Sequence, residues 1–548
     1  MTKDKEKEIA ENQEKNPEKK SEKKEKKPKE KKNLKKLRFG SVSAVVIVLV
    51  VAIVVVLNLM CGIMMKRYPV KLDLTPDNRH ELSEQSIEAL KNIDRDVEIT
   101  VTTTKDYFDS MSVQYQNMFY QYYGVIVDCP YDIIPEILDK YSVYAESGDG
   151  SITVKYIDIN KNPDAVSRWS KYYNGDITEG GIVIQCGERI KFISPSEVAG
   201  MITPSQNSSQ QNISMVFAGE SVLTSAVKAV TDANPVRAAV VSSMNGSPII
   251  DQVHSSVASS VRNFLSKNGY DCTEIDIGID DLSTDVYDMV IVAAPGIDFT
   301  ADIISKLSDF LYNNGNYQKS MIYIPNFYAT NLPNITEFLA DWKIQVEKSA
   351  VFDDSRMVQA SISALGSVTY APTVNISDSE AVGTLQNESL PIVAPQARPI
   401  TILSKNNESI VTELISSSDT SYLVSLDEGN EVSEEQSSYS IVVKSRRETA
   451  SGLDVYGSEL LVIGSPFMLD ELVLSSTTTY NNANAVLNIV NGMTGKEAGD
   501  IIPEKALEQY TLSISTSMAR VILAVVVVVI PLLIAAAGVI VLVWRKNK

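Results

Sequence analysis

Residues 288–294 read DMVIVAA, an almost uninterrupted apolar run of the length of one β-strand. A strand that is apolar at every position is buried on both faces, as in a parallel sheet covered by helices on each side. The pattern continues outward, with expected strands at 237–241, 273–277 and 321–324 and expected helices at 251–267 and 301–313. Strands that alternate with helices in this way predict an α/β fold with a mostly parallel, doubly wound, Rossmann-like sheet.

This Rossmann-like domain is expected to span residues 235–500. Its middle, about 359–451, is rich in Ser, Thr and β-forming residues, which predicts a β-rich insertion. A strand at 460–464 and a helix at 483–491 would then return the chain to the α/β sheet.

A smaller α/β domain is expected over residues 70–200. The local patterns predict strands at 97–101 and 152–158, a helix at 134–144 and a hairpin at 181–193. Residues 201–234 would form a polar linker followed by a helix at 220–231.

Two apolar runs, 41–65 and 521–544, bracket these domains, and neither contains a charged residue. Each is long enough to cross a bilayer core of about 30 Å as a helix. The runs therefore predict two transmembrane helices, the second preceded by a membrane-proximal helix at 501–520. A cleaved signal peptide or a lipidated Cys61 is the alternative for the first run, but no A-x-A pattern is present and Met60 stands where a small residue is expected.

The charges beside the two runs predict orientation. Residues 1–38 hold 16 Lys/Arg against 9 Asp/Glu, and the stub 545–548 is also basic. Lys and Arg next to membrane helices stay cytoplasmic, so we expect a two-pass protein of the cell membrane with both termini in the cytoplasm and an extracytoplasmic body. Residues 1–40 would be a disordered basic tail, which orients the protein or docks on a cytosolic partner or anionic headgroups.

The body between the runs is strongly acidic. Residues 66–520 carry 31 Lys/Arg and 60 Asp/Glu. A surface of this sign repels phosphate backbones. Nucleic acid is therefore excluded as an expected partner.

The residue types that carry catalysis are scarce. The only histidines are His80 and His254, and no G-x-S-x-G nucleophile elbow accompanies them. His254 is interpreted as an ordinary surface or helix-start residue. The sequence predicts no enzyme, no cofactor and no metal site, because clustered zinc ligands and a G-x-G-x-x-G loop at 242–248 are both missing, and GNYQKS at 315–320 lacks the glycine before its lysine.

One candidate ligand site remains, at the ends of the parallel strands. Ligands of open α/β sheets bind in the crevice outside the carboxyl ends of the strands. Ser243, Asn245, Pro295 and Asn326 follow expected strand ends and would line this crevice. The competing interpretation is a purely structural fold without a ligand.

Cysteines and tyrosines leave two further alternatives open. Cys129, Cys186 and Cys272 are odd in number, which does not indicate a disulfide framework, although a Cys129–Cys186 pair is conceivable. Seven tyrosines lie in residues 115–144, where they either form an interface or cover a helix face and a strand edge.

Short motifs in a fixed order give the chain a resemblance to a known family. They are Leu72-Asp73-Leu74-Thr75, Glu81-Leu82-Ser83, Leu138-Asp139-Lys140-Tyr141, Phe217-Ala218-Gly219-Glu220, Asn331-Leu332-Pro333-Asn334 and Leu461-Val462-Ile463-Gly464-Ser465, closed by Pro531, Gly538 and Trp544-Arg545. In this order they resemble the auxiliary components of gliding-motility (GldG-type) ABC transporters. The resemblance covers nearly all of the chain outside the basic tail.

The resemblance implies a non-enzymatic auxiliary subunit that sits beside an ABC permease and a cytosolic ATPase subunit, docked through its membrane helices. Two loops depart from the family pattern. Ser243-Met244-Asn245-Gly246 replaces a Gly-His-Gly-Glu-like loop, and Asn314-Gly315-Asn316-Tyr317 replaces a glycine pair. The alternatives are a membrane-tethered module that binds a glycan or solute and, less favoured, an amidotransferase-like hydrolase.

Overall fold

A computed structural model describes residues 81–507, except 125–128, 147, 174, 206–213, 404–408, 428–430, 434, 452–453 and 497–500; seven single positions, 56, 523, 525, 529, 536, 538 and 544, are also described. The elements below all belong to one compact unit, residues 73–548. We call residues 81–231 the N-lobe and residues 236–494 the C-lobe, because their buried apolar residues form separate clusters.

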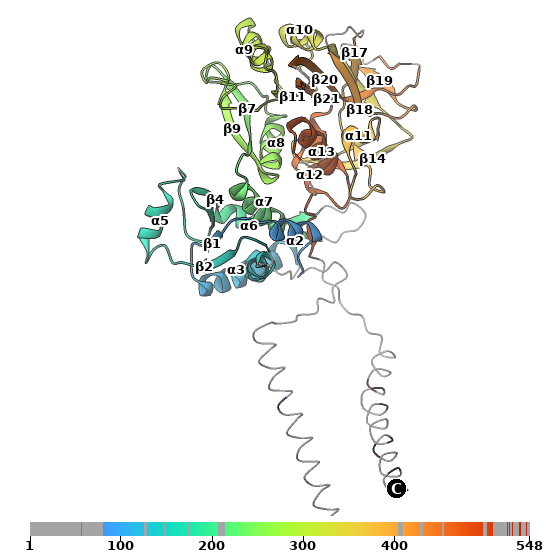
Figure 1. Cartoon of the computed structure of the whole chain (residues 1–548). Coiled ribbons are helices and arrows are strands. Elements are labelled where there is room, and N and C mark those ends of the chain that lie inside the picture. Colours follow the sequence, from blue (N-terminus) through green and yellow to red (C-terminus); the bar gives the residue numbers. More distant parts are fainter. Residues whose placement is uncertain are drawn as a thin grey trace, which may run out of the picture. The chain divides into compact units, whose positions relative to one another are not determined.

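The C-lobe is built on five parallel strands in the order β9-β7-β10-β11-β21. They are β7 (Val236–Met244), β9 (Tyr270–Asp276), β10 (Met289–Ala293), β11 (Ser320–Ile324) and β21 (Asp454–Ile463). Every residue of β10 and β11 is buried, which is what strands covered on both faces require. The structure is therefore mixed α/β with large sheets (Figure 1).

Helices cover both faces of this parallel part. Along β10, Met289, Ile291 and Ala293 pack in one cluster and Val290 and Val292 in another, following the two-residue period of a strand. The first cluster includes side chains of α8 (Ser255–Lys267), α12 (Glu471–Ser475) and α13 (Asn482–Thr494). The second includes side chains of α9 (Ala301–Tyr312) and α10 (Pro333–Asp341).

Antiparallel strands extend the same sheet beyond β21, in the order β20-β18-β15-β14. They are β20 (Ser440–Ser451), β18 (Ile410–Ser416), β15 (Ser367–Ile376) and β14 (Met357–Ile362). Shorter elements complete the C-lobe: β8 (Ser247–Pro248), η1 (Asn313–Gly315), β12 (Ile344–Val346), β13 (Ser349–Phe352), α11 (Ser379–Val382), β16 (Ile392–Val393), β17 (Ile400–Ile402), β19 (Tyr422–Ser425) and η2 (Pro466–Leu469).

The N-lobe has a four-stranded sheet in the order β2-β1-β3-β4. The strands are β1 (Val97–Val101), β2 (Ile152–Tyr156), β3 (Ile182–Cys186) and β4 (Arg189–Ile193). Its helices are α2 (Glu84–Lys91), α3 (Lys105–Tyr123), α4 (Pro130–Ala145), α5 (Pro163–Trp169), α6 (Pro195–Ala199) and α7 (Gly219–Thr231). A second, three-stranded sheet joins β5 (Ile202–Ser205), β6 (Ser214–Phe217) and β22 (Lys505–Ala506).

Local sequence explains where two N-lobe helices begin. The Ser83 hydroxyl accepts a hydrogen bond from the Ser86 N–H and caps α2. Helix α4 begins at Pro130, four residues before the predicted 134, because Cys129 and Asp132 form a capping box and proline is favoured at the first helical position.

The structure contradicts the prediction of a two-pass membrane protein. A helix that crosses a bilayer needs about 20 mostly apolar residues. In the part of the chain that the structure describes, no helix is long and apolar enough; the longest, α3, has 19 residues and begins with Lys105 and Asp106. The membrane localisation, with cytoplasmic termini and an extracytoplasmic body, rested on the two spans and is contradicted by the same finding. The ranges 41–65 and 521–544 lie almost entirely outside the described residues.

The predicted membrane-proximal helix at 501–520 is wrong over its described part. None of residues 501–507 is helical, and Lys505–Ala506 pairs with β6 as the strand β22. The pairing supplies the backbone hydrogen bonds that a helix would otherwise have made. The predicted tail at 1–40, the stub at 545–548 and the rest of 501–520 lie outside the described residues.

Candidate functional site

The candidate site is the carboxyl edge of the parallel strands, where the strand order reverses. β7 pairs with β9 on one side and with β10 on the other. The chain leaves β7 through α8 to reach β9 and then crosses back to β10. Such a reversal is the place where open α/β sheets bind ligands.

Two of the four predicted crevice residues, Ser243 and Asn245, gather around Asp276 at the end of β9. The Ser243 hydroxyl donates to Asp276 Oδ2 (2.9 Å), and the N–H groups of Asn245 and Gly246 donate to Oδ1 (2.8 Å) and Oδ2 (2.6 Å). Asn245 and Gly246 both have positive φ (55° and 80°), as a two-residue hairpin turn between β7 and β8 requires. Desolvation opposes ionisation, but these hydrogen bonds outweigh it and lower the pKa of Asp276 to about 2.

Asn326, the third predicted residue, follows β11 and is fully buried. Its side-chain NH₂ donates to Asp251 Oδ2 (2.6 Å) and to the Ala294 carbonyl (3.2 Å). Its side-chain oxygen accepts from the N–H groups of Tyr328 and Ala329, both at 2.9 Å. All the polar atoms of this side chain are therefore used inside the protein.

Pro295, the fourth predicted residue, pairs as an isolated bridge with Ile250. Next to it, the Gly296 N–H donates to the Ile249 carbonyl (2.7 Å). The segment that leads into α8 is thereby attached to the loop after β10. Pro295 and Asn326 therefore lie beside the segment that leads into α8, whereas Ser243 and Asn245 lie beside Asp276 at the end of β9.

His254, which the sequence predicts to be an ordinary surface or helix-start residue, lies directly before α8 and is fully buried. Its Nδ1 lies 2.9 and 3.0 Å from the two carboxylate oxygens of Asp251. Its Nε2 accepts from the Phe327 N–H (3.5 Å), and its ring stacks on Phe467 with 5.3 Å between centroids. A carboxylate bonded to Nδ1 fixes the tautomer in which Nε2 is the acceptor.

Arg398, which bonds to the backbone of Asn326, is 4% exposed. Its Nη1 donates to the Asn326 carbonyl (2.9 Å) and its Nε to the Glu347 carbonyl (2.8 Å). Desolvation lowers the pKa of the guanidinium from its ordinary value. Arg398 thus fixes the backbone that carries Asn326.

Beside Asp276, this edge presents the charged Asp251 carboxylate, whose side chain is 38% exposed. Desolvation raises its pKa, but hydrogen bonds from Asn326 and His254 outweigh this and hold the pKa of Asp251 below its ordinary value. The imidazole behind it has no exposed nitrogen with which to take or give a proton. The arrangement can hold a polar surface rigidly, but its histidine cannot reach a bound substrate.

Sequence reasoning named His254 but missed Asp251, Arg398 and Asp276. The Asp251-x-x-His254 spacing at the start of the expected helix 251–267 is a signal that could have pointed to Asp251. Arg398 and Asp276 carry no such local signal, because their partners come from other strands.

The lysine of the GNYQKS segment is structural. Lys319 is 8% exposed, and its Nζ donates to the carbonyls of Thr284 (2.7 Å) and Tyr287 (2.8 Å). Cys129 and Cys186 are both buried free thiols, so the conceivable disulfide between them is not formed. Desolvation raises the pKa of Cys129 to about 12.

Three cavities lie away from the carboxyl edge. One of about 830 Å³ includes Arg189, Asn234 and Arg237, and one of about 640 Å³ includes Glu88, Lys228 and Lys267. A third, of about 590 Å³, lies in the N-lobe and includes Gln185, Arg168 and Tyr172. The first two are lined from both lobes.

No family model matches the chain, and no curated protein sequence does. Among solved structures, the mmIFT52 N-terminal domain is 13% identical, with a TM-score of 0.33 and coverage of 48% of this chain and 98% of that one. A ThuA-like protein from Bacteroides uniformis is 14% identical, with a TM-score of 0.30 and coverage of 50% and 97%. A GMP synthase-like protein from Thermoplasma acidophilum is 11% identical, with a TM-score of 0.26 and coverage of 48% and 96%. Similarity at these TM-scores supports no conclusion about function.

Proposed function

We propose that the chain is a non-enzymatic auxiliary subunit of an ABC transporter, which binds a permease and its ATPase subunit through its folded α/β body. The ordered set of motifs that resembles GldG-type auxiliary components supports this class. The partners are expected to contact the surface of the two lobes.

The proposal that the subunit is not an enzyme rests on the burial and hydrogen bonding of His254. Acid–base chemistry requires a group within hydrogen-bond reach of the substrate. His254 has 0% exposure, and its nitrogens bond to Asp251 and to the Phe327 N–H. At the carboxyl edge, where open α/β sheets bind ligands, the polar atoms of His254 therefore bond to other groups of the protein.

Co-purification tests the proposal directly. The full chain, tagged and purified from its native host, is expected to recover an ABC permease and an ATPase subunit at constant stoichiometry. The variant His254→Gln, which keeps a hydrogen-bonding side chain, should recover them equally well. Absence of both partners from the wild-type eluate would contradict the auxiliary role, and a catalytic activity that His254→Gln abolishes would contradict its non-enzymatic character.

A second candidate, a module that binds a glycan or solute, is favoured by the 590 Å³ cavity of the N-lobe. Tyr172 on its rim is 47% exposed, and Gln185, Thr153 and Glu98 supply polar groups beside it. An exposed aromatic ring with polar neighbours suits a sugar face. A glycan that raises the melting temperature of wild type but not of Tyr172→Ala would support this function.

A further inference from the structure

Residues 501–507 contact the cores of both lobes, and we call them the strap. Ile501 belongs to the apolar cluster of the C-lobe, whereas Leu507 belongs to that of the N-lobe. Ile501 is 7% exposed and Leu507 is 1% exposed. The strap is therefore anchored by a buried side chain at each end.

On the N-lobe side, the strap is held by a short strand and a buried ion pair. Lys505 and Ala506 pair with Phe217 and Val216 of β6, and the Leu507 N–H donates to the Met215 carbonyl (2.6 Å). Lys505 Nζ lies 2.5 Å from Glu220 Oε2, with the two side chains 8% and 1% exposed. A strand of two residues supplies few hydrogen bonds, so the ion pair is the main polar attachment.

Glu220 also holds the start of the N-lobe. Its Oε1 accepts from the N–H (2.7 Å) and the hydroxyl (2.6 Å) of Ser83, the cap of α2. Lys505 Nζ in turn donates to the carbonyl of Glu81. One carboxylate therefore joins α2, the first turn of α7 and the strap.

On the C-lobe side, the strap is held by neutral contacts. The Gln386 side-chain amide donates to the Ile501 carbonyl (2.9 Å), and the Gln386 N–H donates to Asn484 of α13 (2.9 Å). Glu504 faces Lys267 of α8 and Glu471 of α12, and desolvation raises its pKa to about 7. Successive residues Glu504 and Lys505 thus interact with different lobes.

Among the described residues, the lobes are also joined by the linker 232–235, by contacts between α7 and α8, and by polar contacts. Lys496 Nζ lies 3.6 Å from Asp232 Oδ2, and Arg189 Nη2 donates to the Ala233 carbonyl (2.7 Å). The 640 Å³ cavity beside the strap is lined by Thr224 of α7 and by Ile502. Lobes with separate cores and a polar, hollow boundary move relative to each other unless something fixes them.

We propose that the strap fixes the relative orientation of the two lobes and that the Glu220–Lys505 ion pair is its clamp. When the clamp opens, the lobes turn about the linker 232–235, and the boundary cavities change with them. Any partner that competes for Lys505 or displaces the strap would release this movement. The device is independent of the auxiliary role proposed above.

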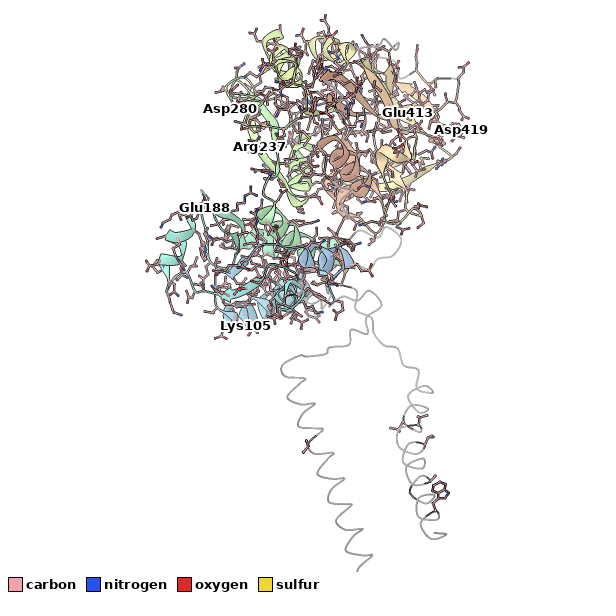
Figure 2. The ribbon with its side chains drawn as sticks, in the orientation of Figure 1. Lys105, Glu188, Arg237, Asp280, Glu413 and Asp419 are labelled. Carbon is pink, nitrogen blue, oxygen red and sulfur yellow. The ribbon has the colours of Figure 1, made fainter. Side chains whose placement is uncertain are left out.

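Distances between spin labels in the two lobes test the clamp. Lys105 in the N-lobe and Asp419 in the C-lobe are exposed and serve as labelling sites after substitution by Cys (Figure 2). Cys61 and Cys272 are replaced by Ser in this background. In the full chain, Lys505→Met is expected to broaden the interlobe distance distribution, whereas Lys505→Arg keeps it narrow.

Two further variants separate the clamp from general destabilisation. Lys444→Met removes a cation 3.4 Å from the buried Glu459 of the C-lobe sheet, which keeps Arg446 as a partner, and should leave the distribution narrow. The double variant Glu220→Gln with Lys505→Met leaves no unpaired buried charge. It should also broaden the interlobe distance distribution, and it replaces the single variant if Lys505→Met does not fold. A narrow distribution in the folded double variant, or equal broadening by Lys444→Met, would overturn the proposal.

Discussion

The ion pair that attaches the strap to the N-lobe and two charged residues of the C-lobe are buried by different means. Glu220 of the N-lobe and Lys505 of the strap are 1% and 8% exposed and pair directly with each other. In the C-lobe, Asp353 and Arg398 are 2% and 4% exposed, yet neutral groups hold them: hydroxyls and amides around Asp353, and carbonyls around Arg398.

The two arrangements differ in the group that is left buried without a partner when one side chain is substituted. Removal of one member of a buried ion pair leaves an uncompensated charge, which is more costly than an unsatisfied neutral group. The N-lobe pair should therefore tolerate single substitutions less well than the C-lobe networks do.

The largest effect is expected for Glu220→Gln. Lys505 loses its counter-charge in a buried position, so the free energy of unfolding should fall by about 3–5 kcal/mol, measured by urea denaturation. Glu220→Gln with Lys505→Met should recover much of this loss. A single variant within about 1 kcal/mol of wild type would show that solvent, and not the pair, compensates these charges.

Arg398→Met comes next. It leaves the carbonyls of Asn326 and Glu347 without their donors, and we expect a loss of about 3 kcal/mol. Urea denaturation measures it, with the exposed pair variant Lys155→Ala as a control that should change stability by less than about 1 kcal/mol. If Arg398→Met proved harmless, the carboxyl edge would not depend on this guanidinium.

Glu504 should give stability a pH dependence of its own. An unfolded glutamate releases its proton near pH 4.3, whereas desolvation raises the pKa of Glu504 in the folded protein to about 7. The folded state therefore binds more protons in this range, and stability falls by about 3 kcal/mol as the pH rises from about 4.3 to 7. Subtracting the pH curve of Glu504→Gln from that of wild type isolates this change; identical curves would refute it.

Asp353 should change stability with pH in the opposite direction to Glu504, and by the smallest amount of these predictions. Desolvation opposes its ionisation, but hydrogen bonds from Ser418, Thr420 and the N–H groups of Ser355 and Arg356 outweigh it and lower its pKa. Its contribution is complete above the unfolded pKa of about 3.9 and is lost as the pH falls through the lower folded value. Asp353→Asn should cost about 1–2 kcal/mol at neutral pH in thermal unfolding and flatten the acid limb.

Local patterns predicted the parallel strands to within a few residues. The expected strands 237–241, 288–294 and 321–324 correspond to β7 (Val236–Met244), β10 (Met289–Ala293) and β11 (Ser320–Ile324). Helix α3 was not predicted, because only Phe108, Ser112 and Phe119 of its residues are buried and exposed Tyr and Val interrupt the apolar stripe. The apolar runs that suggested membrane spans find no counterpart among the described helices.

For the candidate site, the sequence predicted where some residues lie along the chain, but not which residues they bond to. Asn326 follows β11 as predicted, since the end of an apolar run is visible in the sequence, whereas Ser243 lies inside β7, which extends to Met244 beyond the predicted end at 241. Their partners Asp276 and Asp251 depend on which strand and helix lie alongside, which no local pattern specifies. His254 stands at the start of a helix, as one of its two predicted settings has it, but its burial was not predicted, because it comes from Phe467 and Tyr328.

The sequence by itself determined the type and order of the parallel strands of the C-lobe and of most helices that connect them, since hydrophobic period and capping act over a few residues. Only the tertiary structure decided that the segment around Lys505 is a strand and that this lysine meets Glu220. It also decided that His254 is buried against the carboxylate of Asp251. Burial and charge pairing depend on residues that are distant along the chain, and they become visible only when the fold brings those residues together.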